Sequence, residues 1–304
     1  VVYTVDYVAY LDEAMATSED GEHDANTPPE GILGEASGTV EGEKAEGDAK
    51  VGSKVYEKLE EAIAAVEDGE TVTVLRNVDA NIVSDGKSFT LDLNGHVLNS
   101  GVVGKNVVTI MNGTVTVKNG IITGGDWGDN TSQDGKGVLA NNADVTLENC
   151  EIKDNRGYGK KGTTPGYMGG QGGYGFGGGV YAYGGSLTLK DCIVSGNKSS
   201  AKGGGIYAEN CAVTLTGTKV IDNTTGSGSP PGGGIHISSG SLDVDNSTIS
   251  GNTASNGNGN ALALTGANVK VTIKNSELSA SDTKAASLIY TKYGAGPINV
   301  DLEN

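Results

Sequence analysis

Aromatic side chains recur at one position of a repeated segment, at a spacing that could bind sugar rings. The repeated text is GGGVY (177–181), GGGIY (203–207) and GGGIH (232–236). Alternation along a strand places Ile206 inside and Tyr207 outside. The residues expected to face outward are Tyr181, Tyr183, Tyr207, Glu209 and His236. Stacked exposed rings can bind the apolar faces of sugars, whereas an aromatic ladder can equally serve only to cover a flat sheet.

A long insertion precedes the Tyr181 strand and carries further aromatic residues. It reads RGYGKKGTTPGYMGGQGGYGF (156–176), and the only tryptophan, Trp127, lies at the same edge one coil earlier. Long loops on rigid scaffolds usually carry binding functions, although this one could instead be a lid over exposed apolar sheet. The expected ligand-binding residues are Trp127, Tyr158, Tyr167, Tyr174, Tyr181, Tyr183, Tyr207, Glu209 and His236, with Phe176 also lining the groove.

An oxygen-rich loop surrounds the tryptophan and could hold calcium. Its candidate ligands are Asp126, Asp129, Asn130 and Asp134, followed by Gly135. Carboxylate and amide oxygens suit calcium, but the spacing fits no EF-hand register, and ordinary turn chemistry also explains these residues. Calcium is therefore a possible cofactor, and we expect no other.

The sequence makes a poor case for catalysis. A glycoside hydrolase needs two carboxylates across the scissile bond, and Asp243 and Asp245 lie close enough on one strand, although alternating charge on a solvated face explains them equally well. His23, His96 and His236 lie in separate contexts and form no triad or metal cluster. The glycine runs precede strands rather than helices, so we expect no phosphate loop.

A repeated segment indicates the elements that position these residues. Six segments match one template: TVTVKNGIITGG (114–125), DVTLENCEIKDN (144–155), SLTLKDCIVSGN (186–197), AVTLTGTKVIDN (212–223), SLDVDNSTISGN (241–252) and KVTIKNSELSAS (270–281). Another strand precedes each segment, and a third lies within its second half. Three strands per coil with tight polar turns predict an all-β fold, a right-handed parallel β-helix of about seven coils.

Two ladders are expected inside this β-helix. Asn155, Asn197, Asn223 and Asn252 occupy one equivalent turn position, where stacked amides would hydrogen-bond from coil to coil. Cys150 and Cys192 share an inward position on adjacent coils. We expect these two side chains to be in contact, either as buried thiols or as a disulfide. Cys211 is out of that register.

The first 48 residues differ from the rest of the chain. VVYTVDYVAY (1–10) has strong β-propensity, and residues 18–48 are acidic with almost no large apolar side chain. We expect residues 1–48 to form a strand on an extended arm, and residues 49–304 to form the β-helix with a capping helix near 56–67. Because the strand has no evident local partner, it could add to another subunit or fold back on its own β-helix.

Composition and net charge exclude several classes of binding partner. The chain has 304 residues and a net charge of -17, which argues against nucleic acid, anionic membranes and polyanionic glycans, because each phosphate or uronate contact requires Lys or Arg. No run of 18 apolar residues is present, so we expect no membrane span in this chain. The acidic, Gly-rich and Arg-poor composition is typical of a secreted or cell-surface protein.

The repeats resemble those of right-handed parallel β-helix surface proteins of bacteria. The residues that carry the resemblance are GGGI at 203–206 and 232–235, and VSGN, VIDN and ISGN at 194–197, 220–223 and 249–252. They are similar to the tetrapeptides of the polymorphic outer membrane proteins, within the pectate-lyase-like superfold. The resemblance implies display or adhesion. Three functions stay open: a non-catalytic surface protein that binds a host or cell-surface ligand such as glycan, a filament subunit assembled by strand addition, and a carbohydrate-active lyase or hydrolase.

Overall fold

The structure, a computed structural model, consists of two units that are described separately. It describes residues 2–10, 32–41, 47–126, 136–157, 175–226, 232–255, 257–280, 287–292 and 299–303. The two compact units are Val1–Glu46 and Gly47–Asn304. This division falls close to the boundary expected after residue 48.

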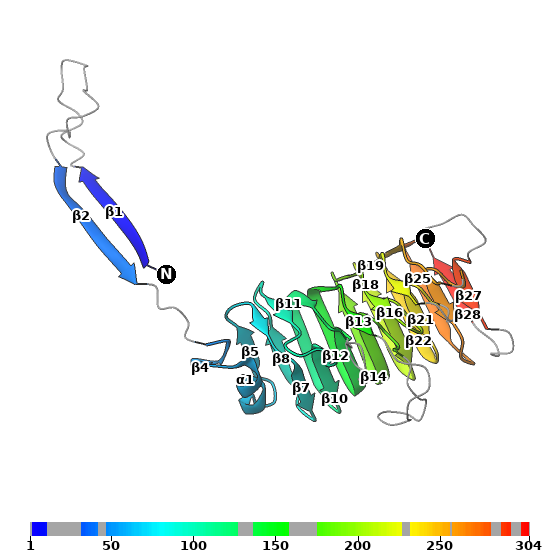
Figure 1. Cartoon of the computed structure of the whole chain (residues 1–304). Helices are drawn as coiled ribbons and strands as arrows, with labels where there is room; N and C mark the ends of the chain where they lie inside the picture. The colour runs from blue at the N-terminus through cyan, green and yellow to red at the C-terminus, as the bar shows by residue number, and fades with distance from the viewer. Residues whose placement is uncertain are drawn as a thin grey trace, which may run out of the picture. The chain divides into compact units, whose positions relative to one another are not determined.

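The first unit is an antiparallel ribbon of β1 (Val2–Tyr10) and β2 (Ile32–Glu41) (Figure 1). The pairing runs from Val2 opposite Glu41 to Tyr10 opposite Ile32. The sequence suggested no local partner for the first strand, yet the partner lies within the acidic segment itself. Antiparallel pairing is made by backbone groups, so a strand of small residues can supply it without large apolar side chains.

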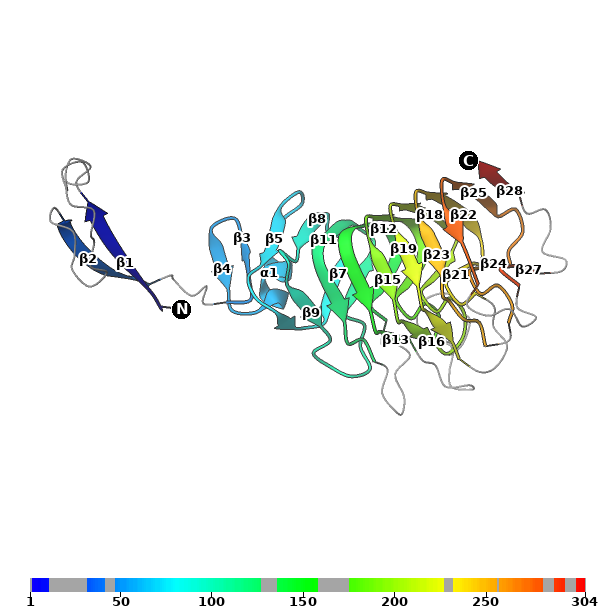
Figure 2. The same ribbon diagram turned by 90° about the horizontal axis from the view of Figure 1, so that it is seen from above.

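The second unit begins with a cap. It contains β3 (Ala49–Val51), β4 (Lys54–Tyr56) and α1 (Leu59–Ala65), and β3 pairs antiparallel with both β4 and β5. The helix buries Leu59, Ala62 and Ile63 at the start of the solenoid (Figure 2). The Lys87 ammonium donates hydrogen bonds to the carbonyl groups of Ile63, Ala64 and Val66 at 3.0, 2.6 and 3.0 Å. These carbonyls end the helix, where a cation is stabilising.

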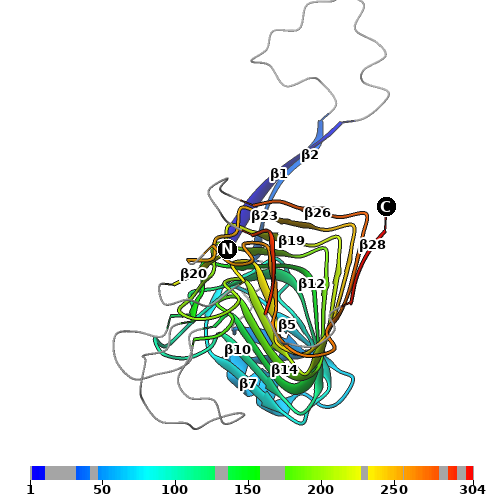
Figure 3. The same cartoon turned by 90° about the vertical axis from the view of Figure 1, so that its right-hand side faces the viewer.

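Beyond the cap, the chain winds through three parallel strand stacks, which form three faces in the view along the axis (Figure 3). The first face holds β7 (Ile82–Asp85), β10 (Val108–Met111), the start of β12 (Val138–Lys153), the start of β14 (Val180–Lys190), β17 (Ile206–Glu209), β21 (Ile235–Ile237), β24 (Leu262–Leu264) and β27 (Ile289–Thr291).

The second face contains the start of the template segments. Its strands are β5 (Thr71–Val74), β8 (Phe89–Asp92), the start of β11 (Thr114–Thr123), the middle of β12, the end of β14, β18 (Cys211–Thr216), β22 (Gly240–Asp245), β25 (Lys270–Lys274) and β28 (Asn299–Glu303).

The third face follows the next corner. Its strands are β6 (Val78–Asp79), β9 (Val97–Asn99), the ends of β11 and β12, β15 (Ile193–Ser195), β19 (Lys219–Ile221), β23 (Thr248–Ser250) and β26 (Glu277–Leu278). A separate edge sheet, which the sequence analysis missed, contains β13 (Arg156–Gly157), β16 (Lys198–Ser199) and β20 (Thr224–Thr225).

The predicted all-β parallel β-helix is confirmed. Inward residues such as Val108, Val138 and Val180 are in direct register from coil to coil and fully buried. Asparagines with positive φ, among them Asn119 and Asn149, turn the chain at the corners, where this residue type tolerates the left-handed conformation. The coil count differs slightly from the seven expected.

The asparagine ladder is also confirmed, and its four residues are fully buried. The Asn155 amide nitrogen donates to Asn197 Oδ1, and Asn197 in turn donates to Asn223 Oδ1, each at 3.0 Å. Asn223 donates to Asn252 Oδ1 at the same distance. Each step also satisfies a backbone N–H, as in the 3.0 Å bond from Asn155 N to Asn197 Oδ1. The ladder therefore satisfies the buried polar groups at one corner of the β-helix and links each coil there to the next.

Cys150 and Cys192 occupy the same position on adjacent coils, are free thiols, and are 3% and 1% exposed. The expected contact is confirmed: the neighbouring Cys192 side chain and burial raise the pKa of Cys150. The next three coils carry Thr218, Ser247 and Ser276 at this position. The backbone N–H of Cys192 donates to Thr218 Oγ1, and the same contact recurs from Thr218 to Ser247. The thiols thus begin a column of small hydrogen-bonding side chains.

Candidate functional site

The predicted aromatic ladder forms on the first face. Tyr181, Tyr207 and His236 are in direct register on β14, β17 and β21. Their ring centroids are 5.4 Å apart from Tyr181 to Tyr207 and 5.2 Å apart from Tyr207 to His236. Phe176, at the end of the long insertion, stacks on Tyr207 with a centroid distance of 4.6 Å and an interplanar angle of 12°. We call Phe176, Tyr181, Tyr183, Tyr207 and His236 the aromatic platform.

The exposure expected for this ladder was wrong for two of its members. Tyr207 is 2% exposed and His236 is fully buried, whereas Tyr181, Tyr183 and Phe176 are half-buried. Alternation along a strand fixes the side on which a residue lies but not what covers it, and the Phe176 ring covers Tyr207. The accessible part of the aromatic platform is therefore its half-buried members.

Polar contacts hold the two buried rings. The Tyr207 hydroxyl donates to Glu209 Oε2 at 2.8 Å. His236 Nε2 lies 2.9 Å from the Thr265 hydroxyl on the next coil, and the donor depends on the histidine tautomer. Both rings are thus fixed in position from within the sheet, which gives them a packing role whatever else they do.

Burial keeps the hydroxyl groups of two platform tyrosines protonated. Burial, with Glu209 and Tyr183 as further causes, raises the pKa of Tyr181 to about 12, and burial also raises the pKa of Tyr207. Both hydroxyls are therefore neutral hydrogen-bonding groups at physiological pH. Burial lowers the pKa of Lys202, an effect that nearby Glu209 opposes.

Two ammonium groups lie over the rings. Lys202 Nζ is 5.6 Å from the centroid of Phe176, and Lys136 Nζ is 5.7 Å from that of Tyr181. These distances are within cation–π range. The platform therefore combines apolar rings and the Glu209 carboxylate with two lysines. The sequence predicted the rings and Glu209 as site residues but not the lysines.

Several predicted site residues lie outside the described residues: Trp127, Tyr158, Tyr167, Tyr174, Asp129, Asn130 and Asp134. Of the candidate calcium ligands, only Asp126 is described, and its carboxylate is 3.6 Å from Arg156 Nη1. Within the described ranges, no group of three or more His, Cys, Asp or Glu side chains could hold a metal ion. The calcium site stays a prediction.

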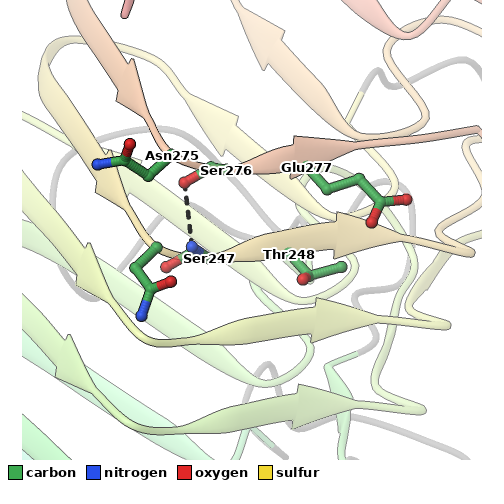
Figure 4. Close-up of a pocket in the computed structure, with 6 residues that line it drawn as sticks. Ser247, Thr248, Asn275, Ser276 and Glu277 are labelled. Atoms are coloured by element: carbon green, nitrogen blue, oxygen red, sulfur yellow. Dashed lines mark hydrogen bonds between the residues drawn. The ribbon is translucent and has the colours of Figure 1, made fainter. Parts of the chain in front are cut away.

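A polar hollow of about 360 Å³ lies at a corner of the last coils. It is lined by Asn246, Ser247 and Thr248 of one coil and by Asn275, Ser276 and Glu277 of the next (Figure 4). The Ser247 backbone N–H donates to Ser276 Oγ at 3.0 Å. The hollow lies at a corner that recurs in each coil, where Asn246 and Asn275 both have positive φ, and its lining contains no aromatic side chain.

Comparison with protein families identifies the class of protein. A family model described as a right-handed β-helix region matches residues 70–278, which contain the aromatic platform. The chain therefore belongs to this right-handed β-helix family. Comparisons with curated proteins and with solved structures found no match. Among the described residues, no helix has the length and apolarity that crossing a membrane requires.

Proposed function

We propose that this chain is a non-catalytic, extracellular β-helix of a bacterial surface that binds glycan on a host or neighbouring cell through its aromatic platform. The observation that carries the proposal is the half-buried group of Phe176, Tyr181 and Tyr183 on a rigid parallel sheet. Ring faces offer apolar contact to the C–H faces of a sugar, and a rigid platform loses little entropy on binding.

The polar groups beside the rings suit sugar hydroxyls. Glu209 can accept hydrogen bonds, and the hydroxyl groups of Tyr181 and Tyr183 can both donate and accept them. Tyr207 and His236 form the buried base of the platform, and we propose that they act by holding the accessible rings at a fixed spacing. Binding would then follow the spacing of Tyr181 and Tyr183 along β14, about 6.6 Å for two residues of a parallel strand.

The carboxylate pair that the enzyme alternative would use lies away from the platform. Asp243 and Asp245 are on β22 of the second face, whereas the rings are on the first. Asp245 also accepts a 3.0 Å hydrogen bond from the Asn275 amide. A carbohydrate-active enzyme would place its acid and base across the bound sugar, and among the described residues these two carboxylates do not meet the rings.

A glycan array with the purified full-length chain tests the proposal. We expect specific retention of some glycans without release of reducing ends in a parallel assay. Tyr181→Ala should weaken retention, whereas Tyr290→Ala should not. Tyr290 is a suitable control because it is also half-buried and stands in the same outward column of the first face, next to Ala263. Release of reducing ends would instead support the enzyme.

The filament alternative has one observation in its favour. β1 and β2 form a sheet of their own with two strands, and such a ribbon leaves one backbone edge of each strand available for strand addition. Electron microscopy of the purified chain tests this second function. Filaments that disappear on deletion of residues 1–41 would support it, and a monomer at high concentration would contradict it.

A further inference from the structure

The edge sheet brings together charged residues that are far apart in the sequence. Arg156 of β13 pairs in register with Lys198 of β16, which pairs with Thr224 of β20. Isolated bridges extend the row through Asp126 to Lys105. The neighbouring residues Gly157 and Ser199 are buried, so the row itself faces outward. We call Lys105, Asp126, Arg156 and Lys198 the edge row, and β20 marks its corner in Figure 3.

The edge row carries more positive than negative charge. Arg156 and Lys198 are on neighbouring strands about 4.8 Å apart, and like charges directly opposite each other are destabilising. Asp126 lies 3.6 Å from Arg156, with the two side chains 39% and 53% exposed. One carboxylate thus lies among three cations in this row. This is a positive strip on a chain whose net charge is -17.

The edge row lies beside the aromatic platform. Lys202, four residues after Lys198, has its ammonium over Phe176. The Lys136 side chain passes beside Gly157 of the edge sheet, with its Cγ 3.5 Å from the position that a Cβ on Gly157 would take. Its ammonium lies over the ring of Tyr181. Lys202 is half-buried, whereas Lys136 is 5% exposed, so Lys202 is the one of these two cations that extends the positive charge along the surface from the edge sheet to the rings.

We propose that the edge row is an anion subsite of the aromatic platform and that the ligand is an acidic glycan bearing carboxylate groups. The sugar rings lie on the platform, and their carboxylates contact Arg156 and Lys198. The Arg156 guanidinium group can bind a carboxylate through two parallel hydrogen bonds beside its contact with Asp126, and the Lys198 ammonium on the neighbouring strand adds a second positive charge. This inference rests on the proposed glycan-binding function, and it reverses the expectation that net charge excludes polyanionic glycans.

The test compares one oligosaccharide in two forms by titration calorimetry with the full-length chain. The first form is a glucuronate-containing hexasaccharide, and the second is the same hexasaccharide with its carboxylates reduced to hydroxymethyl groups. We expect the acidic form to bind roughly tenfold more tightly and to lose that advantage as salt concentration rises. Arg156→Gln combined with Lys198→Gln should abolish the preference while leaving the circular dichroism spectrum unchanged.

The matched control is Lys219→Gln combined with Lys270→Gln, which removes two positive charges from exposed positions on other faces. This control should keep the preference. Equal binding of both forms by the unmodified chain, or a preference that survives in the Arg156 and Lys198 variant, would overturn the anion subsite while leaving the proposed function standing. Binding of neither this hexasaccharide nor any array glycan would overturn the proposed function as well.

Discussion

At the scale of the residue, burial separates members of the aromatic ladder that look equivalent in the sequence. Tyr181 is half-buried, whereas Tyr207, one coil further along, is 2% exposed beneath Phe176. The same motif therefore supplies both a surface ring and a core ring. Substitutions at these two positions should have different consequences.

Tyr207→Ala should lower the free energy of unfolding by about 3 kcal/mol, because it leaves a cavity under Phe176 and removes the hydrogen bond to Glu209. Tyr181→Ala, the control, should cost about 1 kcal/mol, since its ring is partly solvated. Urea unfolding followed by circular dichroism measures both. A Tyr207→Ala variant as stable as the Tyr181→Ala variant would show that the ring is not part of the packed structure.

Asn197→Ala should destabilise the chain by about 3 kcal/mol. The Asn197 side chain accepts hydrogen bonds from the backbone and the amide of Asn155 and donates to Ile152 O and Asn223 Oδ1. Its removal leaves buried polar partners unpaired, and each such group costs on the order of 1–3 kcal/mol. Thr216→Ala, at an exposed position, is the control and should change the midpoint of urea unfolding very little. Equal midpoints for the two variants would contradict the ladder's role.

At the scale of the element, the cap depends on a contact between the helix and the first full coil. Lys87→Met should weaken α1, because the three carbonyls at the end of the helix lose their cationic donor. Hydrogen exchange of amides in 59–66 should accelerate severalfold, while exchange in the coils beyond residue 136 stays unchanged. Uniform acceleration along the whole chain would mean that the cap is not a separate local unit.

The sequence could predict elements that repeat and could not predict elements that do not. Inward Val, Leu and Ile at fixed offsets determine three strands per coil, and the Asn position determines the buried ladder. The edge sheet could not be predicted because β13, β16 and β20 have two residues each, which is too few to show an alternating pattern. The partner of β1 was not predicted because β2 pairs through its backbone, and its many small residues show no strong strand pattern in the sequence.

The candidate site was predictable only in part for the same reason. The GGG motifs located Tyr181, Tyr207 and His236 on one outward column, and the structure bears out that register. Phe176 stacking, the positions of Lys136 and Lys202, and the pairing of Arg156 with Lys198 all depend on how turns of different length meet. No periodic pattern encodes these contacts.

At the scale of the whole molecule, the solenoid is a rigid support whose faces differ in chemistry. The first face carries the aromatic platform, and the corner beside it carries the edge row. Net charge averages over all faces, so a value of -17 does not describe the local field at that corner. The proposed function depends on the difference between faces rather than on composition.

The measurement that tests the central claim most directly is an NMR titration of full-length chain labelled with ¹³C at its tyrosine rings. The ligand is a glycan retained on the array, and Tyr→Phe variants assign the signals. We predict that the ring signals of Tyr181 and Tyr183 shift in a saturable manner, while those of Tyr290 and Tyr56 do not move. Unchanged Tyr181 and Tyr183 signals at saturation, or equal shifts at Tyr290, would contradict glycan binding at the aromatic platform.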